Sequence, residues 1–311
     1  PSVSCIRCAH DVYGACSQPY HHTGVGHTHR DCHLPCWCSI LHIYHHDQEA
    51  STLVKPVVGT VSDLDVGYGR GESILTNFTP KPFTGGHVIG LLGPNACGKS
   101  TFITTLAGVN KPRAGTIAAD IDGQEYTGRK LRDHIGYVPQ DLPVAAALTA
   151  FETVLIAARR ARNVHTVSEK PAAMAARTME ALQIGHLAHS YLGELSGGQR
   201  QLVAVAQMMV VEPHVMLLDE PTSALDLHHQ LFLLETIRNR AESTGAVALV
   251  AIHDINLAAR FCSELMVMKR GGIVAQGSPK DVLDADLIHE VYKVHADILD
   301  HDGVPVVSAV E

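Results

Sequence analysis

Three short runs of hydrophobic residues dominate the pattern of apolar and polar positions along this chain. They occupy residues 87–92, 215–219 and 247–252, and each is largely apolar. Short, nearly continuous hydrophobic runs are typical of parallel strands that are buried on both faces of a sheet. The runs therefore predict an α/β lobe, which we assign to residues 84–139 and 213–275.

A helical spacing of apolar residues marks much of the chain between and after these runs. Residues 145–162 and 168–182 are rich in Ala, Leu and Arg, and they are predicted to be two helices of an insert that covers residues 141–194. Residues 226–243 are amphipathic, and Gly245 stands where a glycine commonly ends a helix.

Strand patterns precede and follow the lobe. Residues 57–63 and 73–79 predict antiparallel strands, and the glycine pair at residues 271–272 predicts a hairpin. After Pro279, two short helical stretches lead to a strand pair that turns at the Asp-Gly of residues 302–303.

A glycine-rich loop follows the first hydrophobic run and leads into a helix from about Ser100. Such a loop lets backbone N–H groups surround phosphate oxygens, and the helix N-terminus adds partial positive charge. The Lys99 ammonium can reach the β- and γ-phosphates, and the Ser100 hydroxyl can ligate Mg²⁺. A glycine-rich turn without a ligand is the alternative, which the strand–loop–helix context disfavours. The residues expected to bind nucleotide here are Gly93, Pro94, Asn95, Ala96, Cys97, Gly98, Lys99, Ser100 and Thr101.

Two adjacent acids end the second run. Asp219 is the last residue of the predicted strand, and Glu220 follows it. One carboxylate can hold Mg²⁺ while the other polarises an attacking water. On these two residues alone, a pair of surface acids at a strand end remains an alternative.

The heptad Leu-Ser-Gly-Gly-Gln-Arg-Gln at residues 195–201 opens a helix that is predicted to run to about residue 211. Ser and Gly at a helix N-terminus can serve as a cap alone. Capping does not require two consecutive glycines and a Gln, whereas close approach to a phosphate does. The residues concerned are Leu195, Ser196, Gly197, Gly198 and Gln199.

The phosphate loop, the heptad and the acid pair, in this order, resemble the nucleotide-binding subunit of an ATP-binding cassette (ABC) ATPase over about residues 58–305. The resemblance implies an α/β fold: a P-loop NTPase core whose mixed or parallel sheet has flanking helices, an antiparallel β subdomain and an α-helical insert. It also implies that the heptad contacts the γ-phosphate held by another copy. ATP would be the substrate, Mg²⁺ the cofactor and a head-to-tail homodimer the active form.

The same resemblance assigns further roles. Glu220 looks like the general base, and His253 matches the switch histidine that contacts the γ-phosphate and the attacking water. Gln140 matches a glutamine that reaches toward Mg²⁺ and this water, and Tyr68 matches the aromatic residue that stacks on adenine. Without the resemblance, a lone His or Tyr at such positions would be read as packing. The expected Mg²⁺ ligands are Ser100, Gln140 and Asp219.

The composition of the chain limits the classes of partner that it is expected to bind. A net charge of −8 and a charged fraction of 18% argue against a nucleic-acid partner. No apolar run approaches the roughly 20 residues that span a bilayer, so the membrane pathway of a transporter is expected in a separate permease. We expect the chain at the cytoplasmic face of a bacterial inner membrane, bound to that permease, with a periplasmic or lipid-anchored substrate-binding protein as an indirect partner.

Cysteine and histidine are concentrated near the N-terminus. Six of the eight cysteines lie in the first 38 residues and nine of the 21 histidines in the first 46. One interpretation is a zinc- or iron-binding tail, although the spacing matches no known zinc module. The other, which we favour, is a reading frame extended upstream of a start near residue 53, because the chain begins at Pro1 and Met174 is its first methionine. The expected division is a Cys/His-rich segment at residues 1–52, an ATPase domain at 53–305 and a tail at 306–311.

Four local strings are similar to importer ATPases for iron complexes of the siderophore, haem or cobalamin type. A zinc or manganese importer ATPase is an alternative, and a non-transport ABC ATPase is another. A DNA-repair cassette would carry a long coiled coil within the insert, and a translation-factor cassette would carry two ATPase halves. An interpretation as a metal-storage protein would depend on the Cys/His-rich N-terminal segment alone. The strings are residues 137–143, 147–152, 199–207 and 225–230.

Overall fold

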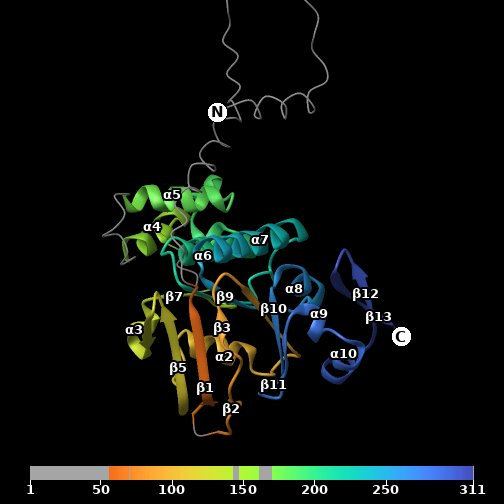
Figure 1. Cartoon of the computed structure of the whole chain (residues 1–311). Helices are drawn as coiled ribbons and strands as arrows, with labels where there is room; N and C mark the ends of the chain where they lie inside the picture. Colours follow the sequence, from red (N-terminus) through yellow and green to blue (C-terminus); the bar gives the residue numbers. More distant parts are fainter. Residues whose placement is uncertain (1–55, 70, 143–146, 161–169, 311) are drawn as a thin grey trace, which may run out of the picture. The chain divides into compact units, whose positions relative to one another are not determined.

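The computed structural model describes residues 56–69, 71–142, 147–160 and 170–310 (Figure 1). The Cys/His-rich segment predicted at residues 1–52 lies outside these ranges. Within them, no helix combines the length and the apolar character needed to cross a lipid bilayer.

A six-stranded sheet forms the centre of the described fold. Its four inner strands and β7 run parallel, and the edge strand β11 is antiparallel to β10. In spatial order the strands are β11 (Gly272–Gly277), β10 (Glu264–Lys269), β4 (Val88–Leu92), β9 (Val247–Ala251), β8 (Val215–Asp219) and β7 (Ile135–Val138). The three hydrophobic runs are therefore three adjacent parallel strands, as predicted, and the β10–β11 hairpin is also confirmed.

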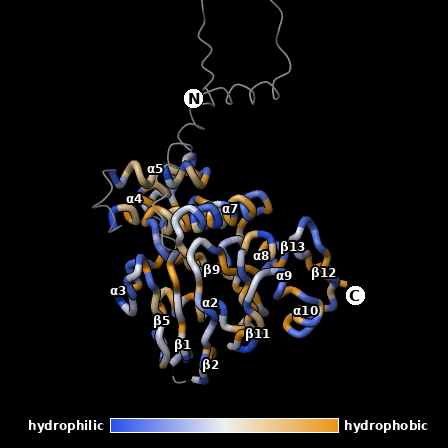
Figure 2. The backbone as a smooth tube through the Cα atoms, in the orientation of Figure 1, coloured by the Kyte–Doolittle hydropathy of each residue, from blue (hydrophilic) through white to orange (hydrophobic). Residues whose placement is uncertain are grey.

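Successive side chains of the central strands enter two different hydrophobic clusters. In β4, Ile89 and Leu91 pack with α2 (Lys99–Leu106) and the antiparallel sheet. Val88 and Leu92 face the opposite side, where the other helices cover the sheet. Each such buried side chain stabilises the fold by about 1.5–3 kcal/mol. Figure 2 shows hydrophobic residues along the inner strands, whereas the outer helix α3 (Gly128–Arg132) is largely hydrophilic.

An antiparallel sheet lies on the α2 side of the central sheet. The pairing of β1 with β2 confirms the two predicted strands. The sequence did not predict β5 and β6, because β5 is exposed along its first half and has no clear alternation of apolar residues. The strands are β2 (Leu75–Phe78), β1 (Val58–Val66), β5 (Ala114–Ile121) and β6 (Gln124–Thr127) in order, with β3 (Phe83–Thr84) also on β1.

The described part of the insert contains the helices α4 (Ala150–Arg160) and α5 (Pro171–Ala181), both of which begin later than predicted. In α4, Thr149 closes the N-terminus: its hydroxyl accepts from the Glu152 amide at 3.2 Å, and the Glu152 carboxylate accepts from the Thr149 amide at 2.9 Å. The helix α5 begins at a proline, and the residue before a proline disfavours helical backbone. Two single turns, η3 (Gly185–Leu187) and η4 (Leu192–Glu194), lead to α6 (Gly197–Met209).

The C-terminal part contains α7 (Leu227–Thr244), α8 (Ile255–Phe261), α9 (Pro279–Val282) and α10 (Ala285–Tyr292), followed by the strands β12 (His295–His301) and β13 (Val304–Val310). The predicted end of α7 is confirmed, since Gly245 has a left-handed φ of 67°. The predicted tail at residues 306–311 needs correction. The valine-rich segment continues as β13 to Val310, which pairs with His295.

Candidate nucleotide-binding site

The predicted site residues converge at the carboxyl ends of the parallel strands. The phosphate loop follows β4, the acid pair ends β8, and His253 and Gln140 come shortly after β9 and β7. Parallel strands bring their carboxyl ends to one edge of a sheet, where ligands bind in this fold class. A cavity of about 460 Å³ lies there, and its lining is Ile74, Asn95, Ala96, Cys97, Gly98, Lys99, Ser100, Thr101, Gln140, Glu220 and His253.

The phosphate loop is shaped by three residues with left-handed backbone. Gly93, Ala96 and Gly98 have φ values of 142°, 62° and 111°. No side chain caps α2, whose N-cap is Gly98, so the first amides of this helix are left for a ligand. The buried Lys99 ammonium donates to the carbonyl of Gly93 at 2.7 Å and to that of Pro94 at 3.3 Å. The loop thus presents amides and one ammonium to an anion.

Cys97 occupies a buried position in this loop. Only 3% of its surface is exposed, and it belongs to the hydrophobic cluster around α2. A Cβ atom built on Gly93 would lie 2.8 Å from the Cys97 sulfur and 2.2 Å from the Met268 carbonyl oxygen. Gly93 is therefore required by close packing, and Cys97 fills apolar space below the loop.

Ser100 and Asp219 supply oxygen atoms suited to a hard divalent cation. The Ser100 hydroxyl donates to the Asp219 carboxylate at 3.1 Å. Burial is the largest influence on the Asp219 carboxyl and raises its pKa, while the Ser100 hydrogen bond opposes the shift. Hydroxyl and carboxylate oxygens are ligands that Mg²⁺ prefers, and a cation there would offset the desolvation of Asp219. The Gln140 amide N–H donates to Glu220, and the predicted role of Gln140 as a Mg²⁺ ligand remains a prediction.

The Glu220 carboxylate lies between two polar side chains. The Gln140 amide donates to one carboxylate oxygen at 2.8 Å, and His253 Nε2 contacts the other. The Glu220 side chain is 12% exposed, whereas His253 is 46% exposed. Glu220 also has a φ of 52°, a backbone conformation that costs about 1–3 kcal/mol for a non-glycine residue. Strain of this kind is common where a side chain must point into a site.

Tyr68 lies beside the phosphate-loop helix with 56% of its surface exposed. Its hydroxyl is 3.4 Å from the Thr101 hydroxyl, and the Asn110 amide donates to it at 3.2 Å. An exposed ring held in this way is suited to stacking, and its contact with adenine remains a prediction. Asn110 and Ile74 could not be predicted as site residues from the sequence, because neither belongs to a local pattern of such residues.

The heptad opens α6, and its serine and glutamine cap this helix reciprocally. The Ser196 hydroxyl accepts from the Gln199 amide at 3.2 Å, and the Gln199 side chain accepts from the Ser196 amide at 2.9 Å. Contrary to expectation, capping accounts for Gln199 within this chain, and its contact with the phosphate of another copy remains a prediction. None of the residues from Leu195 to Gln199 belongs to the lining of the 460 Å³ cavity.

We expect Gly198→Ala to destabilise the protein by about 1–3 kcal/mol, the usual penalty for overpacking. A Cβ atom at Gly198 would lie 2.7 Å from the Ala224 carbonyl oxygen, in the loop that follows Glu220. Gly197→Ala is the matched control, because its Cβ would meet the Ala224 Cβ at an ordinary 3.5 Å. Denaturant unfolding without nucleotide measures both, and equal losses would contradict the packing argument.

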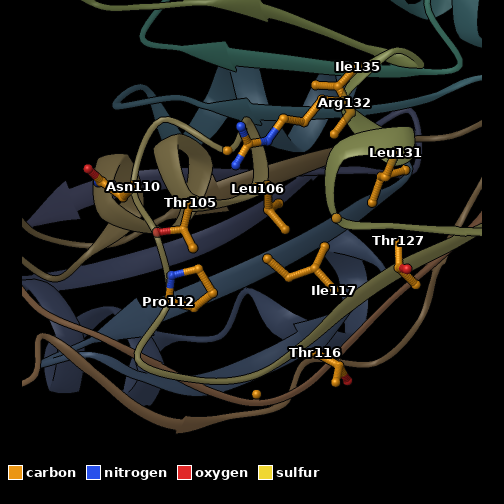
Figure 3. A pocket seen from close by; sticks show the side chains of 13 residues that line it. Thr105, Leu106, Asn110, Pro112, Thr116, Ile117, Thr127, Leu131, Arg132 and Ile135 are labelled. Atoms are coloured by element: carbon orange, nitrogen blue, oxygen red, sulfur yellow. The ribbon is translucent and has the colours of Figure 1, made fainter.

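A second cavity of about 350 Å³ lies between the end of α2, β5 and α3 (Figure 3). Leu106, Pro112, Ile117 and Leu131 line it, and Arg132 is the charged side chain of the lining. It shares no lining residue with the first cavity and lacks its loop amides and carboxylates. Phosphate chemistry therefore belongs to the first cavity.

Comparisons with known proteins agree with this geometry. A family model described as "ABC transporter" matches residues 82–223. The ferric enterobactin transport ATP-binding protein FepC of Escherichia coli (strain K12) is 35% identical, over 78% of this chain and 91% of its own length. The hemin import ATP-binding protein HmuV of Bordetella pertussis (strain Tohama I) is 34% identical, over 79% and 97%. The cobalamin import ATP-binding protein BtuD of Halobacterium salinarum (strain R1) is 36% identical, over 67% and 52%.

One solved structure superposes on this chain with a TM-score of 0.65 at 24% identity. It is described as "An inward-facing conformation of a putative metal-chelate type ABC transporter". It covers 82% of this chain and 97% of that chain. This likeness supports the fold. The relatives of similar length, FepC and HmuV, show that the chain belongs to the ABC transporter family as an ATP-binding ATPase subunit.

Proposed function

We propose that this ATPase subunit powers the uptake of a metal complex, of the iron-siderophore, haem or cobalamin type, through a separate membrane permease. The observation that carries the ATPase part is the convergence of Lys99, the Ser100–Asp219 pair and Glu220 on one cavity. The substrate part is supported by the names of relatives at about 35% identity, which concern ferric enterobactin, cobalamin and hemin.

The geometry supports a division of labour among these residues. Bound ATP would take Lys99 from the Gly93 and Pro94 carbonyls, so the ammonium and the free α2 amides would hold the β- and γ-phosphates. Mg²⁺ held by Ser100 and Asp219 would offset phosphate charge. Glu220 would polarise the attacking water, with Gln140 and His253 fixing the direction of its carboxylate.

Uptake assays test the substrate class. A strain that lacks this gene would be supplied with labelled ferric siderophore, haem or cobalamin, and also with zinc and manganese. Loss of the uptake of ferric siderophore, haem or cobalamin, restored by the wild-type gene and not by Lys99→Ala, supports the proposal. Loss of zinc or manganese uptake alone would favour the alternative importer, and unchanged uptake of all five would favour a non-transport ABC ATPase.

The insert is the proposed docking surface for the permease. It leaves the core after Gln140 and returns at the heptad, so both of its ends adjoin residues assigned to nucleotide. Ile156 on α4 and Tyr191 before η4 are 39% and 49% exposed, which leaves apolar surface for a partner. A permease that moved the insert would shift both nucleotide contacts together, which coupling between two sites requires.

Reversing the charges of Arg159 and Arg160 together is expected to weaken permease association by about tenfold. Both side chains are exposed in the last turn of α4, and rim charges of an interface chiefly affect association. Substrate-stimulated hydrolysis should fall equally, while basal hydrolysis by the isolated subunit stays unchanged. Pull-down with the permease and ATPase assays measure these quantities, and cross-links confined to the β12–β13 hairpin would contradict this docking surface.

A further inference from the structure

The segment 67–74, which joins β1 to β2, borders the nucleotide cavity. Tyr68 lies in it beside α2, and Ile74 at its end belongs to the lining of the 460 Å³ cavity. The strand β5 is antiparallel to β1, so the residues that precede β5 come close to this segment (Figure 1). Two of them, Asn110 and Arg113, contact it, and the mechanism proposed above uses neither side chain.

Arg113 holds the backbone of this segment through its guanidinium. Its three acceptors are the Gly69 carbonyl at 3.0 Å, the Gly71 carbonyl at 2.8 Å and the Ser73 hydroxyl at 3.0 Å. A guanidinium presents its donors in a fixed planar arrangement, so three bonds to one short segment fix the path of that segment. The chain that follows Tyr68 is therefore tied to the residue that precedes β5.

Arg113 is itself held at the end of β1. Its backbone amide donates to the Asp65 carbonyl at 2.8 Å. The Asp65 carboxylate accepts from Ser73, the hydroxyl that the guanidinium contacts. A Cβ atom built on Gly67 would lie 2.8 Å from the Arg113 Cζ atom, so the guanidinium packs directly against the Gly67 backbone. Contacts with residues on both sides of Tyr68 thus fix the backbone from which this side chain projects.

Asn110 holds the hydroxyl end of Tyr68. Its amide donates to the Tyr68 hydroxyl at 3.2 Å and to the Thr104 hydroxyl at 2.7 Å. The Thr104 hydroxyl donates to the Ser100 carbonyl at 2.7 Å within α2. The Tyr68 hydroxyl also lies 3.4 Å from the Thr101 hydroxyl. The end of the ring is therefore joined to the helix that begins at the phosphate loop.

The Tyr68 ring is thus held at both ends by the chain itself, although 56% of the residue's surface is exposed. An exposed aromatic side chain ordinarily loses conformational freedom when it stacks on a ligand, and this loss weakens binding. A ring that is already ordered can receive a planar base without this loss. Stacking on a base is sequence-tolerant and depends mainly on the orientation of the ring.

We propose that Arg113 and Asn110 are positioning residues for the nucleobase, which hold the Tyr68 ring in the orientation in which adenine stacks on it. Neither side chain belongs to the lining of the 460 Å³ cavity, so both act through Tyr68. They affect nucleotide affinity and leave the hydrolysis step unchanged, because Glu220 and Lys99 contact neither of them. The inference rests on the nucleotide site proposed above and on the predicted contact of Tyr68 with adenine.

The first test is a double-mutant cycle between Arg113→Ala and Tyr68→Ala, with calorimetric binding of ADP as the readout. We expect Arg113→Ala to raise the Kd about 3- to 10-fold in the wild-type background and less than twofold in the Tyr68→Ala background, because its effect passes through the ring. Arg129→Ala is the matched control, since Arg129 is an exposed arginine on α3 outside the nucleotide cavity. Equal losses in both backgrounds, or no loss in the wild-type background, would overturn the role of Arg113.

Thermal melting verifies that the Arg113→Ala variant is folded. Arg113→Lys provides a second variant, because it keeps the positive charge and loses the planar arrangement of donors. We expect it to raise the Kd for ADP at least twofold, and a Kd equal to that of wild type would show that charge alone is sufficient. For every variant, kcat at saturating ATP should stay within twofold of wild type, and a fall in kcat would overturn an effect confined to nucleotide affinity.

The second test compares Tyr68→Phe, Asn110→Ala and the two combined. Either substitution removes the bond between the Asn110 amide and the Tyr68 hydroxyl, and the ring is retained. Each should raise the Kd for ADP about 2- to 10-fold, the range that one neutral hydrogen bond supports, and the combined variant should be within twofold of the weaker single variant. Losses that multiply, or a Kd unchanged in either single variant, would overturn the role of Asn110.

Lys99→Ala, measured alongside, separates this inference from the proposed function. We expect its Kd for ADP to rise at least about tenfold, because the ammonium that holds the phosphates is lost. An unchanged Kd in Lys99→Ala would reject the nucleotide site itself. A lost affinity in Lys99→Ala with both cycles negative would reject the positioning roles alone.

Discussion

Replacing Glu220 by Gln is expected to slow ATP hydrolysis by about 10²- to 10⁴-fold, while ATP binding stays within a few-fold of wild type. The substitution removes the charge that would polarise water and nearly preserves the shape. A glutamine can still accept from the Gln140 amide and can donate to His253, so both neighbours keep a partner. Single-turnover hydrolysis and equilibrium binding of ATP measure the two quantities.

Glu235→Gln is the matched control for the loss of one carboxylate. Glu235 pairs with Arg238 on α7, and both side chains are partly exposed outside the nucleotide cavity. This variant should hydrolyse ATP at the wild-type rate. A Glu220→Gln variant that kept more than a tenth of wild-type turnover would show that the water is activated by another group.

The strands whose ends form the site could be predicted, because each is marked by a local run of hydrophobic residues. Strands buried on both faces carry nearly continuous hydrophobic runs, and the runs at residues 87–92, 215–219 and 247–252 are three adjacent strands. Once these strands are parallel, the residues that follow them must share one edge of the sheet. The proximity of Lys99, Asp219 and His253 follows from this topology.

The contacts among these side chains could not be predicted in the same way. Gln140 was expected near Mg²⁺, and the structure bonds it to Glu220, 80 residues further along the chain. Gln199 was assigned to phosphate contact, and it completes a capping box. Local sequence does not distinguish these outcomes, because one amide side chain can serve a cap, a metal or a carboxylate.

Elements with little buried surface were missed for a different reason. Half of β5 is exposed, and its Ala and Gly residues give no alternation that indicates a strand. The end of β13 was taken for a tail, although His295 and Val310 pair at its last described position.

We expect a second large effect from the heptad, through which two copies of the chain would share a nucleotide site. Its residues lie outside the lining of the chain's own phosphate cavity, yet Ser196 opens α6, a helix N-terminus suited to an anion. In a head-to-tail homodimer, each site would combine Lys99 of one copy with Ser196 of the other. The Glu220→Gln variant should then accumulate as an ATP-bound dimer in sedimentation experiments. A variant saturated with ATP that stays monomeric would contradict shared sites.

Mixing two inactive variants provides the sharper test. Lys99→Ala removes the phosphate-binding ammonium, and Ser196→Arg places a bulky side chain at the α6 N-terminus, so we expect each homodimer to be inactive. In a mixed dimer both defects fall on one site, and the other site is complete. If subunits exchange at random, half of the dimers are mixed and each has one of two sites intact, which predicts about one quarter of wild-type single-turnover activity. Thermal melting of each variant verifies that both are folded. If each site were formed within one chain, the mixture would stay inactive at every ratio, because neither variant contains a complete set of residues.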